Sequence, residues 1–191
     1  MLMNRRRLSR LLLAGGGAAA FAAAPRRRAA AATRREIDAD VAAALVRLRN
    51  LPNLAPRLLQ DARAILIFPR IVSGGFIVGG QYGEGAAVGA DGATKGYYNI
   101  AGVSFGLLAG AQAAGLAMFF MTDEALAALI RADGWQIGTG PSVVVLDQGA
   151  QMNITPSTVL EPVYAVTFNQ QGLMASLALE GTKISRITPD A

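Results

Sequence analysis

The 191-residue sequence predicts a single α+β domain that is mostly β-structure. We expect a curved antiparallel or barrel-like sheet, amphipathic helices at the N-terminal end, and one helix in the middle of the chain. Apolar residues at helical spacing predict the helices. Short apolar or alternating stretches between turn signals predict the strands. The chain has 22 glycines, and those within the predicted strands favour a curved sheet.

Two helices are expected before the first strand. Four apolar residues lie on one face of the first helix, at spacings of four, four and three: Ile37, Val41, Leu45 and Leu48. Acidic residues at its start and arginines at its end suit the helix dipole. Pro52 ends this helix, and Pro56 fits the first turn of a short helix that runs through Ala62.

A glycine-rich strand is expected to follow a first apolar strand. The first strand covers residues 65–68 and is bounded by Pro69. Residues 74–89 then alternate between a larger and a very small face, and Asp91-Gly92 provides a turn. Gly83-x-Gly85 resembles part of a nucleotide-binding fingerprint, but no helix or Gly-Lys-Ser/Thr follows it. We therefore interpret the glycines as sites of close backbone approach and sheet bending.

Residues 100–121 contain no charge and are open to two interpretations. The stretch is long enough for a transmembrane helix, and it contains a GxxxGxxxG pattern. The same residues alternate with period two, which predicts two strands joined by a turn near residues 111–115. The glycines and small polar residues make a poor helix, so the strands are favoured.

The rest of the chain predicts one helix and several strands. Thr122 is expected to cap the mid-chain helix, with Arg131 in its last turn and Gly134 after it. Strands are expected over residues 135–137, 142–146, 163–168 and 173–179. Turns are expected at 138–141 and 169–172, and an exposed loop at 155–157.

Residues 1–32 are expected to be an export signal that is removed, which leaves residues 33–191 as the domain. A basic region with the pair Arg5-Arg6 precedes an apolar stretch over residues 11–24. Three alanines then give a cleavage site after Ala32. The arginine pair resembles a twin-arginine signal, and an ordinary Sec signal is the alternative. The mature protein is therefore expected in the periplasm.

The positive charge of the chain belongs to this leader. It holds 7 of the 18 basic residues and no acidic residue, so residues 33–191 carry 18 − 7 = 11 basic and 13 acidic residues, a net charge of −2. Nucleic acid is therefore not an expected partner. The chain has no cysteine and no histidine, which excludes disulfides and Cys–His or Ser–His catalysis. We expect no cofactor, no metal and no enzymatic activity; a hydrolase that uses carboxylates is the alternative.

Several motifs resemble the SYLF domain, also called the Ysc84-type domain. They are Ala62–Pro69, Gly75–Gly85, Gly110–Gln112, Met121–Asp123 and Gly172–Gly181. The resemblance covers roughly residues 35–187, with departures at Tyr97–Asn99 and Gly138–Gly140. It implies a β-rich α+β domain that associates with lipids. In eukaryotic relatives this means phosphoinositide membranes and actin regulation.

Four residues are the candidate lipid-binding residues: Arg57, Arg63, Arg70 and Tyr82. Arginines pair well with phosphates, and the alternative is a set of solvated charges beside a buried strand. Tyr82 is a candidate for lining a pocket, and the alternative is an ordinary sheet residue. The expected partner is a phospholipid or membrane surface. The alternative is a protein of the cell envelope that pairs with an exposed sheet edge.

Overall fold

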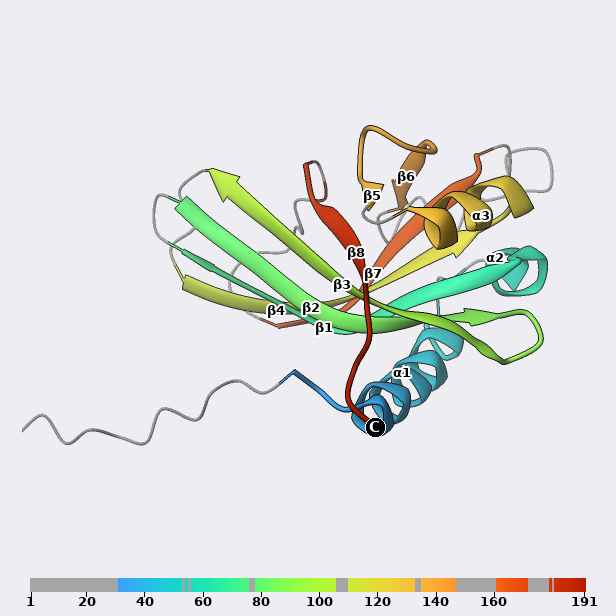
Figure 1. Cartoon of the computed structure of the whole chain (residues 1–191), viewed down its shortest axis with the longest axis horizontal. Helices are drawn as coiled ribbons and strands as arrows, with labels where there is room; N and C mark the ends of the chain where they lie inside the picture. The colour runs from blue at the N-terminus through green and yellow to red at the C-terminus, as the bar shows by residue number, and fades with distance from the viewer. Residues whose placement is uncertain are drawn as a thin grey trace, which may run out of the picture. The chain divides into compact units, whose positions relative to one another are not determined.

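A sheet of eight strands, flanked by three helices, makes up the part of the chain that the computed structural model describes (Figure 1). The described residues are 31–52, 54, 56–75, 78–105, 110–132, 135–146, 161–171, 179 and 181–191. Residues Ala31–Ala191 form one compact unit. The predicted fold class, a β-rich α+β domain with a curved sheet and a mid-chain helix, is confirmed.

The first two helices cover one face of the sheet. Helix α1 (Arg34–Arg49) begins at Thr33, whose side chain and the Glu36 side chain form a capping box. Ile37, Val41 and Leu48 are buried as predicted, while Ala44 is fully buried and Leu45 is only half-buried. Helix α2 (Pro56–Asp61) follows and buries Leu58.

The sheet order is β5-β8-β3-β2-β1-β4-β7-β6. Its strands are β1 (Ala64–Gly75), β2 (Val78–Gly89), β3 (Thr94–Phe105), β4 (Gly110–Phe120), β5 (Trp135–Gln136), β6 (Val143–Leu146), β7 (Val163–Gln171) and β8 (Lys183–Ile187). All neighbours are antiparallel except β6 and β7, which are parallel. Helix α3 (Asp123–Arg131) follows β4, and Thr122 caps it as predicted.

The connection between the two end strands requires the sheet to curl. Strands β5 and β6 lie at opposite ends of the strand order, yet only residues 137–142 separate them in the chain. Seven inter-strand spacings of about 4.8 Å would hold the edges of a flat sheet about 34 Å apart. The connecting segment spans at most about 25 Å when fully extended. The sheet therefore forms the half-barrel visible in Figure 1.

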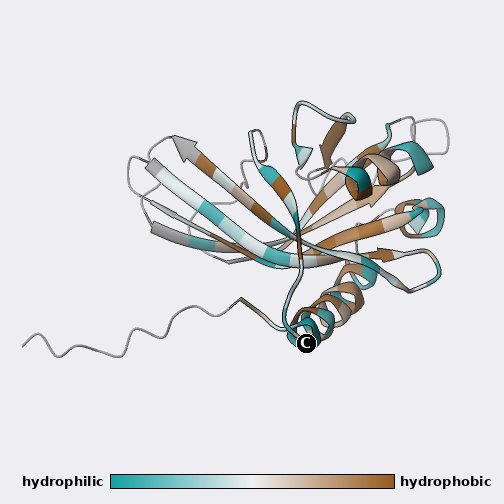
Figure 2. Ribbon diagram, viewed as in Figure 1, coloured by the Kyte–Doolittle hydropathy of each residue, from teal (hydrophilic) through white to brown (hydrophobic). Residues whose placement is uncertain are grey.

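Two hydrophobic cores lie on the two faces of the sheet. One packs α3 and Trp135 against Leu66, Phe68 and Ile100. The other packs α1 and α2 against Ile67, Phe119 and other residues of the opposite face. Figure 2 shows the most hydrophobic colours where the helices cover the strands, whereas β2 is mostly pale or teal. The packed cores therefore occupy only part of the length of the long strands.

Strand β1 continues through Pro69, so the predicted end at Phe68 is wrong. The register of β1 shifts between Ile67 and Arg70 against β2, and between Phe68 and Ile71 against β4. A β-bulge tolerates proline because the ladder is already interrupted there. The strand then runs to Gly75.

Within the stretch 100–121, residues 100–105 and 110–120 are strand rather than helix, which overturns the transmembrane alternative. These residues fall within β3 and β4, and β4 already begins at Gly110, so the turn predicted near 111–115 is also wrong. Antiparallel pairing of β4 with β1 and β7 sets these bounds. Among the described residues, no helix has the length and apolar character needed to cross a membrane.

Two further expectations near the C-terminal end are corrected. The turn predicted at 169–172 is wrong, because β7 runs to Gln171 with Asn169 at a φ of 51°. Strand β8 was not predicted, since its short sequence gives no clear alternation. The loop predicted at 155–157 and the strand predicted at 173–179 lie outside the described residues, except for Leu179. The Asp91-Gly92 turn is present, with Gly92 at a φ of 78°.

The glycines of β2 allow close backbone approach, as predicted. A Cβ atom on Gly83 would lie 2.7 Å from the carbonyl oxygen of Arg70. A Cβ atom on Gly85 would overlap the carbonyl group of Ile67. Both contacts lie beside the β1 bulge, where the irregular backbone presses toward β2.

Candidate functional site

The structure separates the three candidate arginines. Arg57 lies on α2 and forms an ion pair of 3.4 Å with Asp61. Arg63 precedes β1 and lies 3.7 Å from Asp123, with both side chains largely exposed. Arg70 follows Arg63 by seven residues along an extended strand, a separation of roughly 20 Å. Arg70 therefore has different neighbours from the other two.

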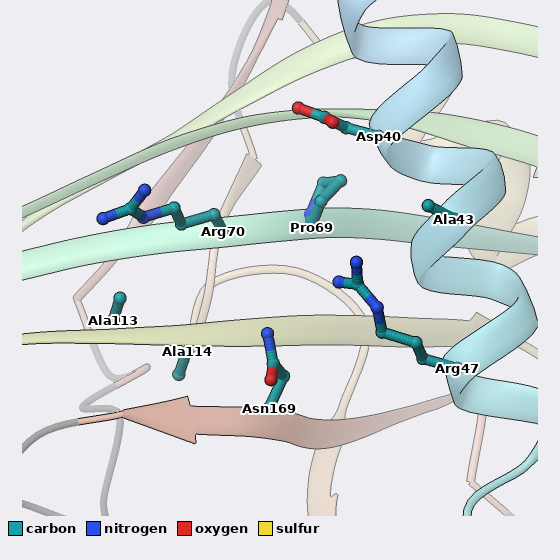
Figure 3. A pocket seen from close by; sticks show the side chains of 8 residues that line it. All are labelled: Asp40, Ala43, Arg47, Pro69, Arg70, Ala113, Ala114 and Asn169. Carbon is teal, nitrogen blue, oxygen red and sulfur yellow. The ribbon is translucent and has the colours of Figure 1, made fainter.

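Arg70 instead shares a pocket with Arg47 of α1. The pocket has a volume of ≈ 280 Å³. Its lining comes from α1 (Asp40, Ala43, Arg47), β1 (Pro69, Arg70), β4 (Ala113, Ala114) and β7 (Asn169). Figure 3 shows the Arg47 guanidinium and the Asn169 amide pointing into the same space beside Pro69. We call this the arginine pocket.

The β1 bulge decides that Arg70 faces α1. Before the bulge, Phe68 belongs to the core on the α3 face, whereas Ile67 belongs to the core on the α1 face. After the bulge, Ile71 belongs to the α3 face, so Arg70 beside it points to the α1 face. The sequence did not predict that Arg70 faces α1, because the predicted strand ended at Phe68, before Arg70.

Helical spacing and a second irregularity complete the arginine pocket. Asp40, Ala43 and Arg47 are separated by three and four residues, which places them on one face of α1. Asn169 adopts a left-handed conformation where the pairing of β4 with β7 shifts between Ala113 and Gly115. The helical spacing of Asp40, Ala43 and Arg47 is the sequence signal that would have identified this face of α1.

The arginine pocket carries a net positive charge. Within the described residues, the ion pairs are Arg57–Asp61, Arg63–Asp123 and Lys95–Asp91, so neither Arg47 nor Arg70 takes part in one. Asp40 supplies the one negative charge in the lining. A guanidinium donates several hydrogen bonds in a plane and binds phosphate or carboxylate oxygens well. The pocket is therefore suited to an oxyanion.

An exposed apolar strip lies beside Arg70 on the same face of the sheet. It consists of Val72, Tyr82 and Val103, which are 46%, 48% and 65% exposed. Val72 pairs with Tyr82 across β1 and β2, and Val103 pairs with Gly80 across β2 and β3. We call these three residues the apolar strip. Such side chains are available to bind an apolar surface.

Tyr82 is held in place by Glu84. The Tyr82 hydroxyl donates a hydrogen bond of 2.6 Å to Glu84 Oε1, and the backbone N–H of Ala32 donates to Glu84 Oε2 at 3.0 Å. Partial burial, followed by the hydrogen bond to Glu84 and its charge, raises the pKa of Tyr82 above its ordinary value. The phenol is therefore neutral at physiological pH, and its ring is oriented within the apolar strip.

A second pocket, of ≈ 310 Å³, is also basic. Arg34, Lys95 and Arg186 line it. Lys95 is paired with Asp91 at 2.6 Å, and Arg34 Nε donates to the Pro189 carbonyl oxygen at 3.1 Å. We regard the arginine pocket as the stronger candidate because the exposed apolar strip lies beside it on the same face of the sheet. In the described part of the chain, no three acidic side chains gather in a way that would hold a metal ion.

Comparison with known families gives one match. The Ysc84 family model, described as "Las17-binding protein actin regulator", matches residues 101–188. This range contains Val103, Ala113, Ala114 and Asn169, whereas Arg47 and Arg70 precede it. No curated protein matches the chain at a significant level.

Proposed function

We propose that this chain, whose residues 101–188 match the Ysc84 (SYLF) family model, is a non-enzymatic protein that associates with phospholipid membranes. Binding of a lipid or of a protein partner is the coarser function that the family suggests. One observation carries the finer proposal: the arginine pocket and the apolar strip are adjacent on the same face of the sheet. The arginines bind the lipid phosphate, and the strip contacts the apolar part of the membrane.

The spacing along β1 supports this division of roles. Arg70 and Val72 are two residues apart after the bulge, which places them on one face, about 7 Å from each other. A surface that lies flat on a membrane therefore presents charge and apolar area together.

The expected association is weak and reversible. Full burial of an apolar side chain contributes about 1.5–3 kcal/mol, so the three half-exposed members of the apolar strip contribute roughly 1 kcal/mol each. Each arginine near an anionic membrane surface adds about 1 kcal/mol. The sum, about 5 kcal/mol before the cost of association, describes a peripheral protein that leaves the membrane at high salt.

Vesicle flotation tests the proposal. Residues 33–191 are floated with vesicles of phosphatidylcholine alone and of phosphatidylcholine with phosphatidylglycerol, at low and high salt. The wild type is expected to bind the anionic vesicles and to lose most of that binding at high salt, because screening acts beyond about 8–10 Å. The pair Arg47→Glu and Arg70→Glu is expected to abolish the preference for anionic vesicles.

A second pair of substitutions gives the matched control. Arg57→Glu and Arg63→Glu change the charge equally, at residues whose side chains already lie beside carboxylates. If only this second pair abolishes binding, the lipid contact lies near α2, as the sequence alone suggested. If the folded wild type binds neither kind of vesicle, the proposed membrane association is wrong. Circular dichroism confirms that each variant is folded.

The proposal includes export to the periplasm, with cleavage after Ala32. Thr33 is the capping residue of α1, so a mature chain that begins at Thr33 keeps the whole capping box, which supports this site. Cleavage there removes the hydrogen bond from Ala32 to Glu84, while the hydrogen bond from Tyr82 to Glu84 remains. The intact mass of the exported protein is expected to correspond to residues 33–191. A mass that retains Arg26–Arg28 contradicts the cleavage site, and unchanged export after Arg5→Lys and Arg6→Lys contradicts the twin-arginine route.

A protein-interaction module of the cell envelope is the second candidate function. It is favoured by strand β6, which ends the strand order and exposes 52% of Val145. An extended peptide could add to such an edge through backbone hydrogen bonds. A wild-type protein that floats with no vesicle but whose partner binding is lost on Val145→Pro would favour this candidate.

A further inference from the structure

The glycine-rich part of the sheet carries a buried serine hydroxyl on the face opposite the apolar strip. Ser73 of β1 is 5% exposed, and its Oγ has no hydrogen-bond partner among the described residues. Buried polar groups in folded proteins are almost always hydrogen-bonded, so an exception requires an explanation. Ser73 follows Val72, so it points to the face opposite the apolar strip.

Glycines are frequent among the described residues that surround Ser73 in the sheet. Its nearest neighbours on the same face, from the pairing of β1 with β2 and β4, are Ile71, Gly75, Gly79, Gln81, Gly83, Gly110, Gln112 and Ala114. Four of these eight are glycines, so half of these neighbours present no side chain to the hydroxyl. We call Ser73 and these neighbours the Ser73 site.

A row of polar side chains crosses the Ser73 site. Gln112, Ser73 and Gln81 lie directly opposite one another on β4, β1 and β2. Gln81 is 8% exposed, and its Nε2 donates a hydrogen bond of 2.7 Å to Thr182 Oγ1, itself 1% exposed. The row is therefore held in place by a buried hydrogen bond, and none of the eight neighbours of Ser73 carries a charge.

We propose that the Ser73 site binds a neutral acyl ester, whose carbonyl oxygen accepts a hydrogen bond from the Ser73 hydroxyl. The absence of charge among the neighbours disfavours an ionised group, which would be costly to bury without a partner. Gly75, Gly79 and Gly110 present no side chain, so an unbranched methylene chain would meet less steric hindrance beside them than a bulkier group. The inference rests on the proposed membrane association, since a protein at a membrane meets acyl esters.

Native mass spectrometry with monolauroylglycerol tests the proposal on residues 33–191. The wild type is expected to form a one-to-one adduct and to bind dodecanoate, the charged relative, more weakly. Ser73→Ala is expected to weaken ester binding about fivefold to tenfold, the effect of one neutral hydrogen bond. The same substitution is expected to raise the Tm of the ligand-free protein, because it removes an unsatisfied hydroxyl.

Ser185→Ala is the matched control, since Ser185 is a half-buried serine on β8, opposite Asn99. It is expected to leave ester binding unchanged. The proposal is overturned if no one-to-one adduct forms, if Ser73→Ala binds the ester as the wild type does, or if Ser73→Ala lowers the Tm of the ligand-free protein. The last result would show that the hydroxyl already has a partner.

The Ser73 site and the proposed membrane-binding residues lie on opposite faces of the sheet, so the two proposals can be tested separately. Ser73→Ala leaves the arginine pocket and the apolar strip intact, so vesicle flotation is expected to persist. The pair Arg47→Glu and Arg70→Glu is expected to keep ester binding. Flotation without ester binding overturns only the acyl-ester site. Ester binding without flotation overturns the membrane association and leaves a lipid-binding site on the α3 face of the sheet.

Discussion

The four long strands pass through two regions with opposite character. In the first, which we call the covered half, helices pack on the sheet and Leu66, Phe68 and Phe119 are completely buried. In the second, the glycine half, the apolar strip is exposed on one face and the Ser73 site lies on the other. The same hydrogen-bonded ladders run through both. Pairing therefore does not require a packed core, and the two halves can serve stability and binding separately.

The bulge at Pro69 marks the boundary on β1. Before it, the strand reads Ala-Ile-Leu-Ile-Phe, with bulk on both faces; after it, the strand reads Ile-Val-Ser-Gly-Gly. The bulge turns Arg70 toward the α1 face and Ser73 toward the α3 face of the sheet. The register shift of one residue at the bulge therefore determines to which face of the sheet each candidate residue of β1 points.

The largest expected effect is a difference in the free energy of unfolding between a variant in the covered half and a variant in the glycine half. Phe68→Ala, in the covered half, is expected to lower the free energy of unfolding by about 3–5 kcal/mol, because it removes a fully buried aromatic ring. Val72→Ala, on the same strand in the glycine half, is expected to change it by less than about 0.5 kcal/mol, because Val72 is largely exposed. Urea unfolding measures both, and equal losses would contradict the division.

An intermediate effect is expected at the β2 glycines. Gly85→Ala is expected to lower the free energy of unfolding by about 1–3 kcal/mol, because the new Cβ would overlap the Ile67 carbonyl. Gly83→Val is expected to lower it by a similar amount, since a Cβ at Gly83 would lie 2.7 Å from the Arg70 carbonyl oxygen.

Gly80→Ala is the matched control for these glycines. Only the Gly102 carbonyl oxygen lies near its Cβ position, at 4.0 Å. This variant is expected to be unchanged or up to about 1 kcal/mol more stable, because alanine restricts the unfolded chain. Thermal unfolding of all three variants measures the contrast. Equal stability of Gly80→Ala and Gly85→Ala would show that close approach is not the reason for the glycines.

The smallest expected effect concerns a buried hydroxyl in the covered half. Tyr98 is 1% exposed, and its hydroxyl has no hydrogen-bond partner among the described residues. Tyr98→Phe is expected to be neutral or to stabilise the protein by up to about 1 kcal/mol. The hydroxyl of Tyr164, by contrast, accepts a hydrogen bond of 3.3 Å from the Glu161 N–H. Tyr164→Phe is expected to lower the free energy of unfolding by about 0.5–1 kcal/mol.

The pH dependence of stability provides a second measurement on Tyr98. Burial raises the pKa of Tyr98 above its ordinary value, against an opposing effect of Arg186. The folded protein therefore holds the phenolic proton more tightly than the unfolded chain does. This contribution is complete below the unfolded pKa of about 10 and is lost as pH rises toward the folded pKa. The urea midpoint is expected to fall less between pH 8 and pH 11 in Tyr98→Phe than in the wild type; an equal fall contradicts the assignment.

Local signals allowed much of the covered half to be predicted from the sequence. Thr122 and the first turn of α3 are separated by only a few residues, and so are the apolar positions that define α1. The Asp91-Gly92 turn is also local, since Gly92 requires a left-handed conformation that glycine adopts easily. The small face of β2 follows from simple alternation. These features depend on neighbours in the chain, so composition and spacing determine them.

The arginine pocket depended on contacts that no local pattern encodes. Arg47 and Arg70 are 23 positions apart in the sequence, and they line one pocket because a bulge turns the Arg70 side chain to the face of β1 that α1 covers. Asn169 joins them from β7 through a register shift against β4. The sequence therefore determined the helices, the glycine strand and the β-rich class. Only the tertiary structure decided which side chains share a face, because a single residue of register exchanges the two faces of a strand.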